Sequence, residues 1–262
     1  MSPEELSSQQ TEMPSLVSRV MAFAHHGGRI LRHRFPGYTF DDLAACQDAL
    51  DGPAFQKVAR RMWADPTGQR LMEERPRISL TTVDWRALSM MPIESLGYNL
   101  WHHFYDNGIL HDVPLGEPIV RWDPETEYAK WRYRETHDIR HVLVGLGVEG
   151  YEEVILQTFQ CAQQFQVLSA GIVIGGGLKH AIIDHRVLEL VRNIPRAWRL
   201  GRRTRFLSNV YYEELWETPL EVVRQRLEIT PIGDAYPVKQ RHPDAPGQPQ
   251  QVASGEKVNK NG

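Results

Sequence analysis

The residues with the clearest capacity for chemistry lie in one stretch, residues 133–141 (YRETHDIRH), and at Glu153. On a helix each residue advances by about 100°. His137 and His141 are then one turn apart, and Asp138 falls in the same stripe. Two imidazoles and a carboxylate therefore converge on one side of a helix. Nitrogen and carboxylate ligands without thiolates suit zinc, iron or manganese, and the ligand types alone do not select among the three metals.

A fourth ligand has to come from a neighbouring element. Residues 145–150 (GLGVEG) give the chain a place to reverse its direction. Glu153 would then lie in the first turn of the next helix and face the histidines. Glu149 and Glu152 are alternative ligands. A further interpretation is that all three glutamates form a solvated helix face and bind no metal. A lone His-x-x-x-His pair is more often an ordinary surface or core feature, so the adjacent carboxylates carry much of the argument for a metal.

Helical signals dominate the chain between its two ends. Apolar residues recur with the helical period, and turn residues separate the runs. Helices are expected at 15–34, from 41, and at 53–64, 84–105, 124–146, 150–173, 180–198 and 219–227. A break in the helical structure is expected at the triple glycine 175–177. No run alternates with period two for long enough to predict a strand. The sequence thus predicts an all-α fold, a single-domain helical bundle.

Composition limits the remaining classes. The formal charge of −3 argues against nucleic-acid binding, because there is no basic excess to neutralise phosphates. Cys46 and Cys161 have no metal-type spacing and are expected to be reduced core residues. Disorder is predicted for residues 1–13 and 237–262, which leaves one domain at 14–236. The first residues do not predict a secretory signal, and the longest apolar stretch, 167–178, is too short to span a membrane.

The motif and its surroundings resemble the Coq4 family of ubiquinone biosynthesis. His-Asp-x-x-His, then eleven residues, then Glu is the family pattern, and residues 137–141 with Glu153 match it in full. Similarity to the family extends from about residue 88 to residue 229. It includes LGY at 96–98, YRETH at 133–137, Trp198-x-x-Gly-Arg202, YEELW at 212–216 and Pro219-Leu220. The sequence departs from the family at Arg140, where a bulky apolar or aromatic residue is expected, and at the triple glycine.

The resemblance implies an activity and a ligand set. Family members are peripheral membrane proteins that help remove the carboxylate from the first ring carbon of a polyprenylated 4-hydroxybenzoate-type precursor, coupled to hydroxylation there. This chain would then be a metal-dependent carboxy-lyase (an oxidative decarboxylase). A divalent zinc, iron or manganese ion would be held by His137, Asp138, His141 and Glu153. Arg134 or Arg140 would hold the substrate carboxylate through a bidentate contact.

The same resemblance implies a lipid setting. The expected partners are the polyprenylated quinone precursor, other ubiquinone-biosynthesis enzymes and, as a further expectation, a second copy in a homodimer. The glycine-bearing segment 167–178 is a candidate wall for the prenyl channel, with tight helix packing as the alternative. Residues 192–206 hold six arginines and no acidic residue. Peripheral membrane contact is expected there, through Trp198, Arg199, Arg202, Arg203 and Phe206. The alternative is a solvated basic face. The expected location is the cytoplasmic face of a bacterial inner membrane, or the mitochondrial inner membrane in a eukaryote.

Two rival functions remain open from the sequence. The first is a non-catalytic scaffold that presents prenylated intermediates to other enzymes and holds a purely structural metal. The second is a metal-dependent phosphohydrolase, because such enzymes also contain an adjacent His-Asp pair. That class needs further histidines and a distant aspartate, for which His180, Asp184 and His185 are the candidates.

Overall fold

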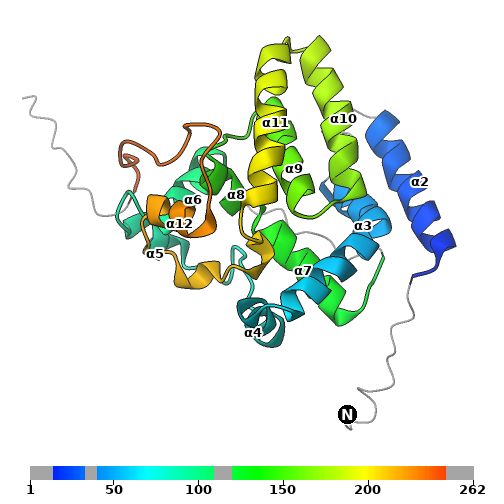
Figure 1. Ribbon diagram of the computed structural model, residues 1–262, viewed down its shortest axis with the longest axis horizontal. Helices are drawn as coiled ribbons and strands as arrows, with labels where there is room; N and C mark the ends of the chain where they lie inside the picture. Colours follow the sequence, from blue (N-terminus) through cyan, green and yellow to red (C-terminus); the bar gives the residue numbers. More distant parts are fainter. Residues whose placement is uncertain (1–13, 33–39, 109–119, 246–262) are drawn as a thin grey trace, which may run out of the picture.

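Helices make up the regular structure of the computed structural model, which describes residues 14–32, 40–108 and 120–245 (Figure 1). Within these residues no strand forms, and the β-type pairing is confined to an isolated bridge between Ser95 and Pro219. The predicted all-α fold class is therefore confirmed. Residues 1–13 and the end of the predicted tail, 246–262, lie outside the described residues. None of the helices in the described ranges is long and apolar enough to cross a bilayer.

Helices follow one another along the described part of the chain. In order they are α2 (Leu16–Arg32), α3 (Phe40–Trp63), α4 (Pro66–Glu74), α5 (Trp85–Met90), α6 (Leu96–Asp106), α7 (Pro124–Glu135), α8 (His137–Val144), α9 (Gly150–Gln163), α10 (Val167–Ile182), α11 (Val187–Arg203), the 3₁₀ helices η1 (Leu207–Asn209) and η2 (Tyr212–Glu214), and α12 (Leu220–Leu227).

Two large apolar clusters contain most of the core, and a third, small one consists of Ala49, Val120 and Trp122. The larger joins α6, α8, α9, α11 and α12, with members that include Leu100, Leu143, Phe159, Leu200 and Val223. The smaller joins α3, α4 and α7 and contains Phe55, Met62, Leu71, Tyr128 and Tyr133. Removing a large apolar side chain from such a cluster costs about 2–5 kcal/mol. Because α8 lies within the larger cluster, packing on several sides fixes its position.

The single helix expected at 124–146 is instead two helices that meet at Thr136. The backbone of Thr136 has φ −98° and ψ 8°, outside the α-helical region, and its hydroxyl donates to the carbonyl of Arg132 at 2.7 Å. A threonine that bonds back to the preceding turn bends or interrupts a helix. As a consequence α8 begins at His137, and the metal-ligand candidates start a helix of their own.

The expected helix 150–173 is also two helices, because α9 ends at Gln163 and α10 starts at Val167. Asp51 of α3 caps the new start: its Oδ1 accepts from the backbone N–H of Val167 at 2.6 Å and of Leu168 at 3.3 Å. The expected break at the triple glycine does not occur. A Cβ at Gly176 would lie 3.0 Å from Val154 on α9, so close packing on α9 explains why the helix runs on through these glycines.

Two further expectations about helices are wrong. The helices expected from 41 and at 53–64 are one helix, α3, which runs on through Pro53. The helix expected at 84–105 is two, α5 and α6, and Ser95 caps the start of α6 by accepting from the backbone N–H of Tyr98 at 3.0 Å.

Two other expectations differ from the structure at their boundaries. The helix expected at 180–198 begins at Val187 and continues to Arg203. The first nine residues of the predicted tail, 237–245, pack on the domain. The backbone N–H of Val238 donates to Asn99 at 2.8 Å, and Arg241 donates to the carbonyl of Ser89 at 2.8 Å. Apolar contacts add to these bonds, because Ala245 belongs to the larger apolar cluster and Val238 packs against it. Composition misses this segment because few of its side chains are apolar.

Candidate metal centre

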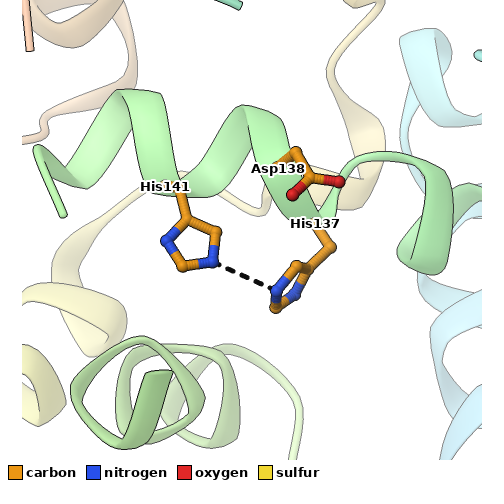
Figure 2. A group of neighbouring side chains, drawn as sticks. All are labelled: His137, Asp138 and His141. Carbon is orange, nitrogen blue, oxygen red and sulfur yellow. Dashed lines mark hydrogen bonds between the residues drawn. The ribbon is translucent and has the colours of Figure 1, made fainter. Parts of the chain in front are cut away.

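Two histidines of α8 form the centre of the candidate site. Figure 2 shows the rings of His137 and His141 on the same side of the helix, with Asp138 beside them. The Nε2 atoms of the two histidines are 3.2 Å apart. One candidate ligand atom from each of the three residues lies within 4.8 Å of the others. The convergence that the helical spacing predicts is therefore present.

The turn between α8 and α9 brings a carboxylate to the histidines. Gly145 ends α8 with φ 80°, in the left-handed region that favours glycine, and the chain reverses there. Glu153, in the first turn of α9, then lies with Oε1 2.9 Å from Nε2 of His141 and Oε2 3.5 Å from Nε2 of His137. The structure places the predicted fourth residue at the cluster.

The two alternative glutamates are engaged elsewhere. The carboxylate of Glu152 accepts from the backbone N–H of Gly147 at 3.0 Å and of Glu149 at 3.3 Å, as the inner half of a capping box. The side chain of Glu149 pairs with Arg186 at 3.4 Å. Helix capping therefore uses Glu152 and leaves Glu153 to face the histidines.

A third element reaches the site through residues that the sequence reasoning missed. His103 of α6 is fully buried, and its Nε2 lies 3.1 Å from Oδ1 of Asp138. Its Nδ1 is 2.8 Å from the hydroxyl of Tyr236. A neutral imidazole that donates from Nε2 accepts at Nδ1, so the chain runs from the Tyr236 hydroxyl through His103 to the carboxylate of Asp138. No local spacing links residues 103, 138 and 236, so only the fold brings them together.

A fourth contact comes from further along α9. The side-chain amide of Gln160 lies 3.1 Å from Nδ1 of His137, and its other end accepts from the hydroxyl of Tyr133. Gln160 follows Glu153 by seven residues, two helical turns, so both side chains project from one face of α9. That spacing is visible in the sequence and is the one signal that points to Gln160.

The charges at the cluster favour ionised carboxylates. Burial by itself raises the pKa of Glu153, but His137 and His141 outweigh burial and hold the pKa of this carboxyl well below its usual range. Burial also raises the pKa of Asp138, and the hydrogen bond from His103 reverses the direction, so that the pKa is lowered. For His137, burial lowers the pKa and the charge of Glu153 more than compensates, so that the pKa is raised. Each group stabilises the charged form of its neighbour.

The spacing of the ligand atoms fits a metal ion. In a tetrahedral site with bonds of about 2.0–2.1 Å, neighbouring ligand atoms are about 3.3 Å apart. The separations among His137, His141 and Glu153 are 3.2, 2.9 and 3.5 Å. Two imidazole nitrogens at 3.2 Å need either a proton or a cation between them, because their lone pairs would otherwise face each other. The three groups are therefore arranged as ligands of a divalent ion would be.

The cluster is closed on one side and open on the other. The side chain of His141 is fully buried, whereas those of His137, Asp138 and Glu153 are 26, 24 and 34% exposed. An ion held by these residues would lie at the edge of the core, where a second molecule has access. An accessible position is typical of catalytic sites and differs from the closed shell of structural zinc.

The two arginines expected to bind the substrate carboxylate do not lie in equivalent places. Arg134 donates to Gln47 at 2.6 Å, to the carbonyl of Ala44 at 3.0 Å and to Asp48 at 2.7 Å, all on α3. These acceptors occupy its guanidinium away from the histidines. Arg140 is buried, donates to the carbonyl of Tyr133 at 2.9 Å and lies over the ring of that residue. In the described part of the chain no carboxylate forms an ion pair with Arg140.

The residues expected at the membrane divide into two groups. Trp198 is 45% exposed, and Arg199, Arg202 and Arg203 are exposed beside it on α11. Phe206 is buried, with the guanidinium of Arg61 3.8 Å from its ring centre. The expectation that Phe206 contacts lipid is therefore wrong, because the residue follows the end of α11 and the chain turns inward there.

The residues that a phosphohydrolase would need lie at the far end of α10. His180 Nδ1 is 2.5 Å from Asp184 Oδ2, and the ring of His180 packs against the backbone of Gly150. His185 has φ 55° in the turn that follows. Within the described residues, none of the three makes a hydrogen bond or ion pair with His137, Asp138, His141 or Glu153.

Comparisons with known proteins agree on one family. The family model described as coenzyme Q (ubiquinone) biosynthesis protein Coq4 matches residues 13–233. A mitochondrial ubiquinone biosynthesis COQ4 homologue of Bos taurus is 31% identical over 218 residues, covering 82% of this chain and 80% of the relative. A mitochondrial COQ4 homologue of Culex quinquefasciatus is 33% identical over 192 residues, covering 72% of this chain and 68% of the relative.

A solved structure has the same fold. A protein of Nostoc punctiforme PCC 73102 assigned to ubiquinone biosynthesis superposes with a TM-score of 0.58 and covers 81% of this chain and 95% of its own. The two sequences are 22% identical.

Proposed function

The chain belongs to the Coq4 family of ubiquinone biosynthesis proteins, and on that premise we propose that it is a metal-dependent oxidative decarboxylase of polyprenylated 4-hydroxybenzoate-type precursors. The reaction replaces the carboxyl group on the first ring carbon by a hydroxyl group and releases carbon dioxide. This is a two-electron oxidation, for which we propose dioxygen as the oxidant; one water is consumed and hydrogen peroxide is the second product. The observation that carries the proposal is the accessible cluster of His137, His141 and Glu153, with its ligand-like spacing.

The proposed ligands are His137, Asp138, His141 and Glu153, and they suit a zinc, iron or manganese ion. When bound, the ion supplies Lewis acidity and a template for anionic oxygens of the substrate. Asp138 and Glu153 stay ionised at neutral pH because their pKa values are lowered, so the cluster is ready to bind a cation. His103 keeps the carboxylate of Asp138 oriented through its Nε2 hydrogen bond.

Arg140 is proposed to offset the negative charge of the substrate. It lies one residue before His141 and has no carboxylate partner in the described residues. A guanidinium without a counter-ion in a buried position stabilises an anion that approaches it. Arg134 takes no part in the proposal, because three acceptors on α3 already bind its guanidinium.

Contact with a membrane surface is the second part of the proposal. Apolar side chains are exposed along one stripe of α10 and the first half of α11: Val167, Ile174, Leu178, Ile182, Val187, Leu188 and Val191. On α11 a stripe of arginines adjoins the apolar one, and Arg196, Arg199 and Arg203 line a surface cavity of about 250 Å³ with residues 230–232. Apolar insertion beside cationic side chains is how peripheral helices bind anionic lipid.

This membrane contact would place the protein where prenylated precursors and the other ubiquinone-biosynthesis enzymes are found. The proposed location is the cytoplasmic face of a bacterial inner membrane, or the mitochondrial inner membrane in a eukaryotic host. Packing of a second copy against the same apolar stripe, to form a homodimer, is the competing use of this surface.

Metal content tests the proposal most directly. Purified without chelator, the wild type should hold about one zinc, iron or manganese per chain by elemental mass spectrometry. His141→Ala should lose the metal and the decarboxylation of carboxylated prenylphenols, while circular dichroism shows unchanged helix content. His180→Ala is the matched control and should keep both, because His180 lies at the far end of α10.

Three results would overturn the assignment. Decarboxylation that persists in metal-free His141→Ala would remove the metal from the mechanism. A bound metal without turnover would favour a scaffold that presents prenylated intermediates. Loss of metal in the His180→Ala control, with phosphate released from nucleotides by the wild type, would revive the phosphohydrolase.

A further inference from the structure

Helix α9 contacts both ring nitrogens of His137. Glu153 lies 3.5 Å from Nε2, and the amide of Gln160, two turns later, lies 3.1 Å from Nδ1. Gln160 is 1% exposed, so its amide cannot turn to bulk water for a partner. Its far end bonds to the hydroxyl of Tyr133, which is itself buried. The side chain is thus held at both ends by partners inside the protein.

The end of the amide that faces His137 decides which nitrogen of the ring carries the proton. A neutral imidazole has one N–H and one lone pair. The NH₂ group of Gln160 faces Nδ1, so Nδ1 accepts and the proton is on Nε2, among His141 and Glu153. A metal ligand needs the opposite arrangement, with the lone pair on Nε2 and the N–H on Nδ1. Ligating histidines almost always donate that second N–H to an acceptor.

We propose that Gln160 is the positioning residue that selects Nε2 of His137 as a metal ligand, by turning its amide so that the carbonyl accepts from Nδ1–H. The inference rests on the metal centre of the proposed function. The two ends of a primary amide have nearly the same shape, so the half-turn needs no movement of the backbone. His137 stays neutral throughout: the proton on Nε2 leaves to solvent, and one from solvent is taken up at Nδ1.

Tyr133 makes both orientations of the amide possible. A hydroxyl group both donates and accepts, so it can donate to the carbonyl of Gln160 in one state and accept from its NH₂ in the other. Burial raises the pKa of Tyr133, which keeps the hydroxyl protonated. His141 has no comparable partner, because its Nδ1 is buried and makes no hydrogen bond within the described residues. Control of the tautomer is therefore specific to His137.

Substitutions at Gln160 test whether zinc binding needs a hydrogen-bond acceptor at Nδ1 of His137. Gln160→Glu offers only acceptors and should hold the proton on Nδ1, so zinc affinity should equal or exceed that of the wild type. Gln160→Met keeps the length of the side chain, offers nothing to Nδ1, and should weaken zinc binding by about 10- to 100-fold. Affinity is measured by competition with a chromophoric chelator, and thermal melts of the metal-free proteins report folding.

Nitrogen NMR gives the readout that a merely structural role would not move. At pH 9 the metal-free wild type should show His137 with the proton on Nε2. The zinc-loaded wild type and metal-free Gln160→Glu should both show it on Nδ1. Resonances are assigned by their loss in His137→Asn.

The outcomes also separate this inference from the proposed function. Wild-type zinc affinity in Gln160→Met, or a proton already on Nδ1 in the metal-free wild type, overturns the role of Gln160 and leaves the metal centre standing. If the wild type binds no zinc, iron or manganese at all, the metal centre fails and the inference fails with it. If Gln160→Met does not fold, Gln160→Glu still decides, since a proton that remains on Nε2 in its metal-free form contradicts the proposal.

Discussion

Asp138 differs from the other ligand candidates because a second histidine holds it. The chain from the Tyr236 hydroxyl through His103 to Asp138 is buried at its centre and joins three separate parts of the sequence. Hydrogen bonds to a ligating carboxylate fix its orientation, and their loss typically costs 10- to 100-fold in metal affinity. At the scale of single residues, these hydrogen bonds from Tyr236 through His103 to Asp138 are the largest part of the site that no local sequence pattern predicts.

His103→Phe should therefore weaken zinc binding by about 10- to 100-fold, because an aromatic ring still fills the space while both hydrogen bonds of the imidazole are lost. Tyr236→Phe should have a smaller effect, since it removes only the outer link. Chelator competition measures both. The matched control is His102→Phe, which should bind zinc like the wild type. In the wild type His102 lies 3.2 Å from Asp106 and makes no hydrogen bond or ion pair with Asp138 in the described part of the chain. Equal losses in the His102 and His103 variants would mean that the effect is general to α6.

The sequence predicts part of the site for a clear physical reason. His137 and His141 face the same way because of the helical period, and Glu153 reaches them because Gly145 allows the chain to turn. Both relations are local. His103 and Tyr236 depend instead on how α6 and the C-terminal segment pack against α8, and spacing along the chain carries no information about that packing.

At the scale of elements, the expectations that failed were decided by contacts between helices. No proline or glycine lies between residues 125 and 144. Thr136 nevertheless divides the expected helix through a hydrogen bond to the preceding turn. The triple glycine had the opposite outcome. Its intrinsic cost in a helix, about 1 kcal/mol per residue, is opposed by the close packing of α10 on α9.

The start of α10 makes stability depend on pH. Asp51 is fully buried, its Oδ2 has no hydrogen-bond partner in the described part of the structure, and burial raises its pKa to about 6 from an ordinary value of 3.8. A raised carboxyl pKa favours the folded protein at low pH. This contribution is fully present below pH 3.8 and is lost as the pH rises through about 6.

Asp51→Asn, which stays neutral, should therefore be more stable than the wild type at pH 8 by up to roughly 3 kcal/mol, and should show little difference at pH 4. The amide oxygen can still accept from the backbone N–H groups of Val167 and Leu168. Urea unfolding at the two pH values measures the effect. Asp65→Asn, which changes the half-buried N-cap of α4, is the control and should not gain stability at pH 8. A gain at pH 4 equal to that at pH 8 would contradict the assignment to ionisation.

At the scale of the whole molecule, the exposed apolar stripe sets one end of the protein apart. Ile174 and Leu188 are 74 and 82% exposed, one on each helix of the α10–α11 pair. Figure 1 shows these two helices rising together from the body of the protein. Helix α2 also exposes apolar side chains, among them Leu16, Val17 and Met21. Exposed apolar surface of this kind is typical of a region that binds a membrane or another protein.

The double variant Ile174→Glu/Leu188→Glu should bind anionic vesicles at least about tenfold more weakly, because each large apolar side chain contributes roughly 1.5–3 kcal/mol when removed from water. Co-sedimentation measures the loss. Met90→Glu, which changes a 52% exposed residue on α5, is the control and should bind like the wild type. Binding of the double variant that matches the wild type would contradict membrane contact. If instead the wild type is dimeric and the double variant monomeric by light scattering, this surface joins two copies.

The order of the site residues along the chain has a consequence for biosynthesis. His137, Asp138, His141 and Glu153 fall within one helix–turn–helix unit, so closing the loop between them costs little chain entropy. During translation all four emerge from the ribosome within 17 residues, and Gln160 follows them directly. Tyr236 emerges last of the residues around the site. If the site holds the proposed ion, a nascent chain can bind that ion before the C-terminal segment docks on α6. Docking then adds the hydrogen bond between Tyr236 and His103.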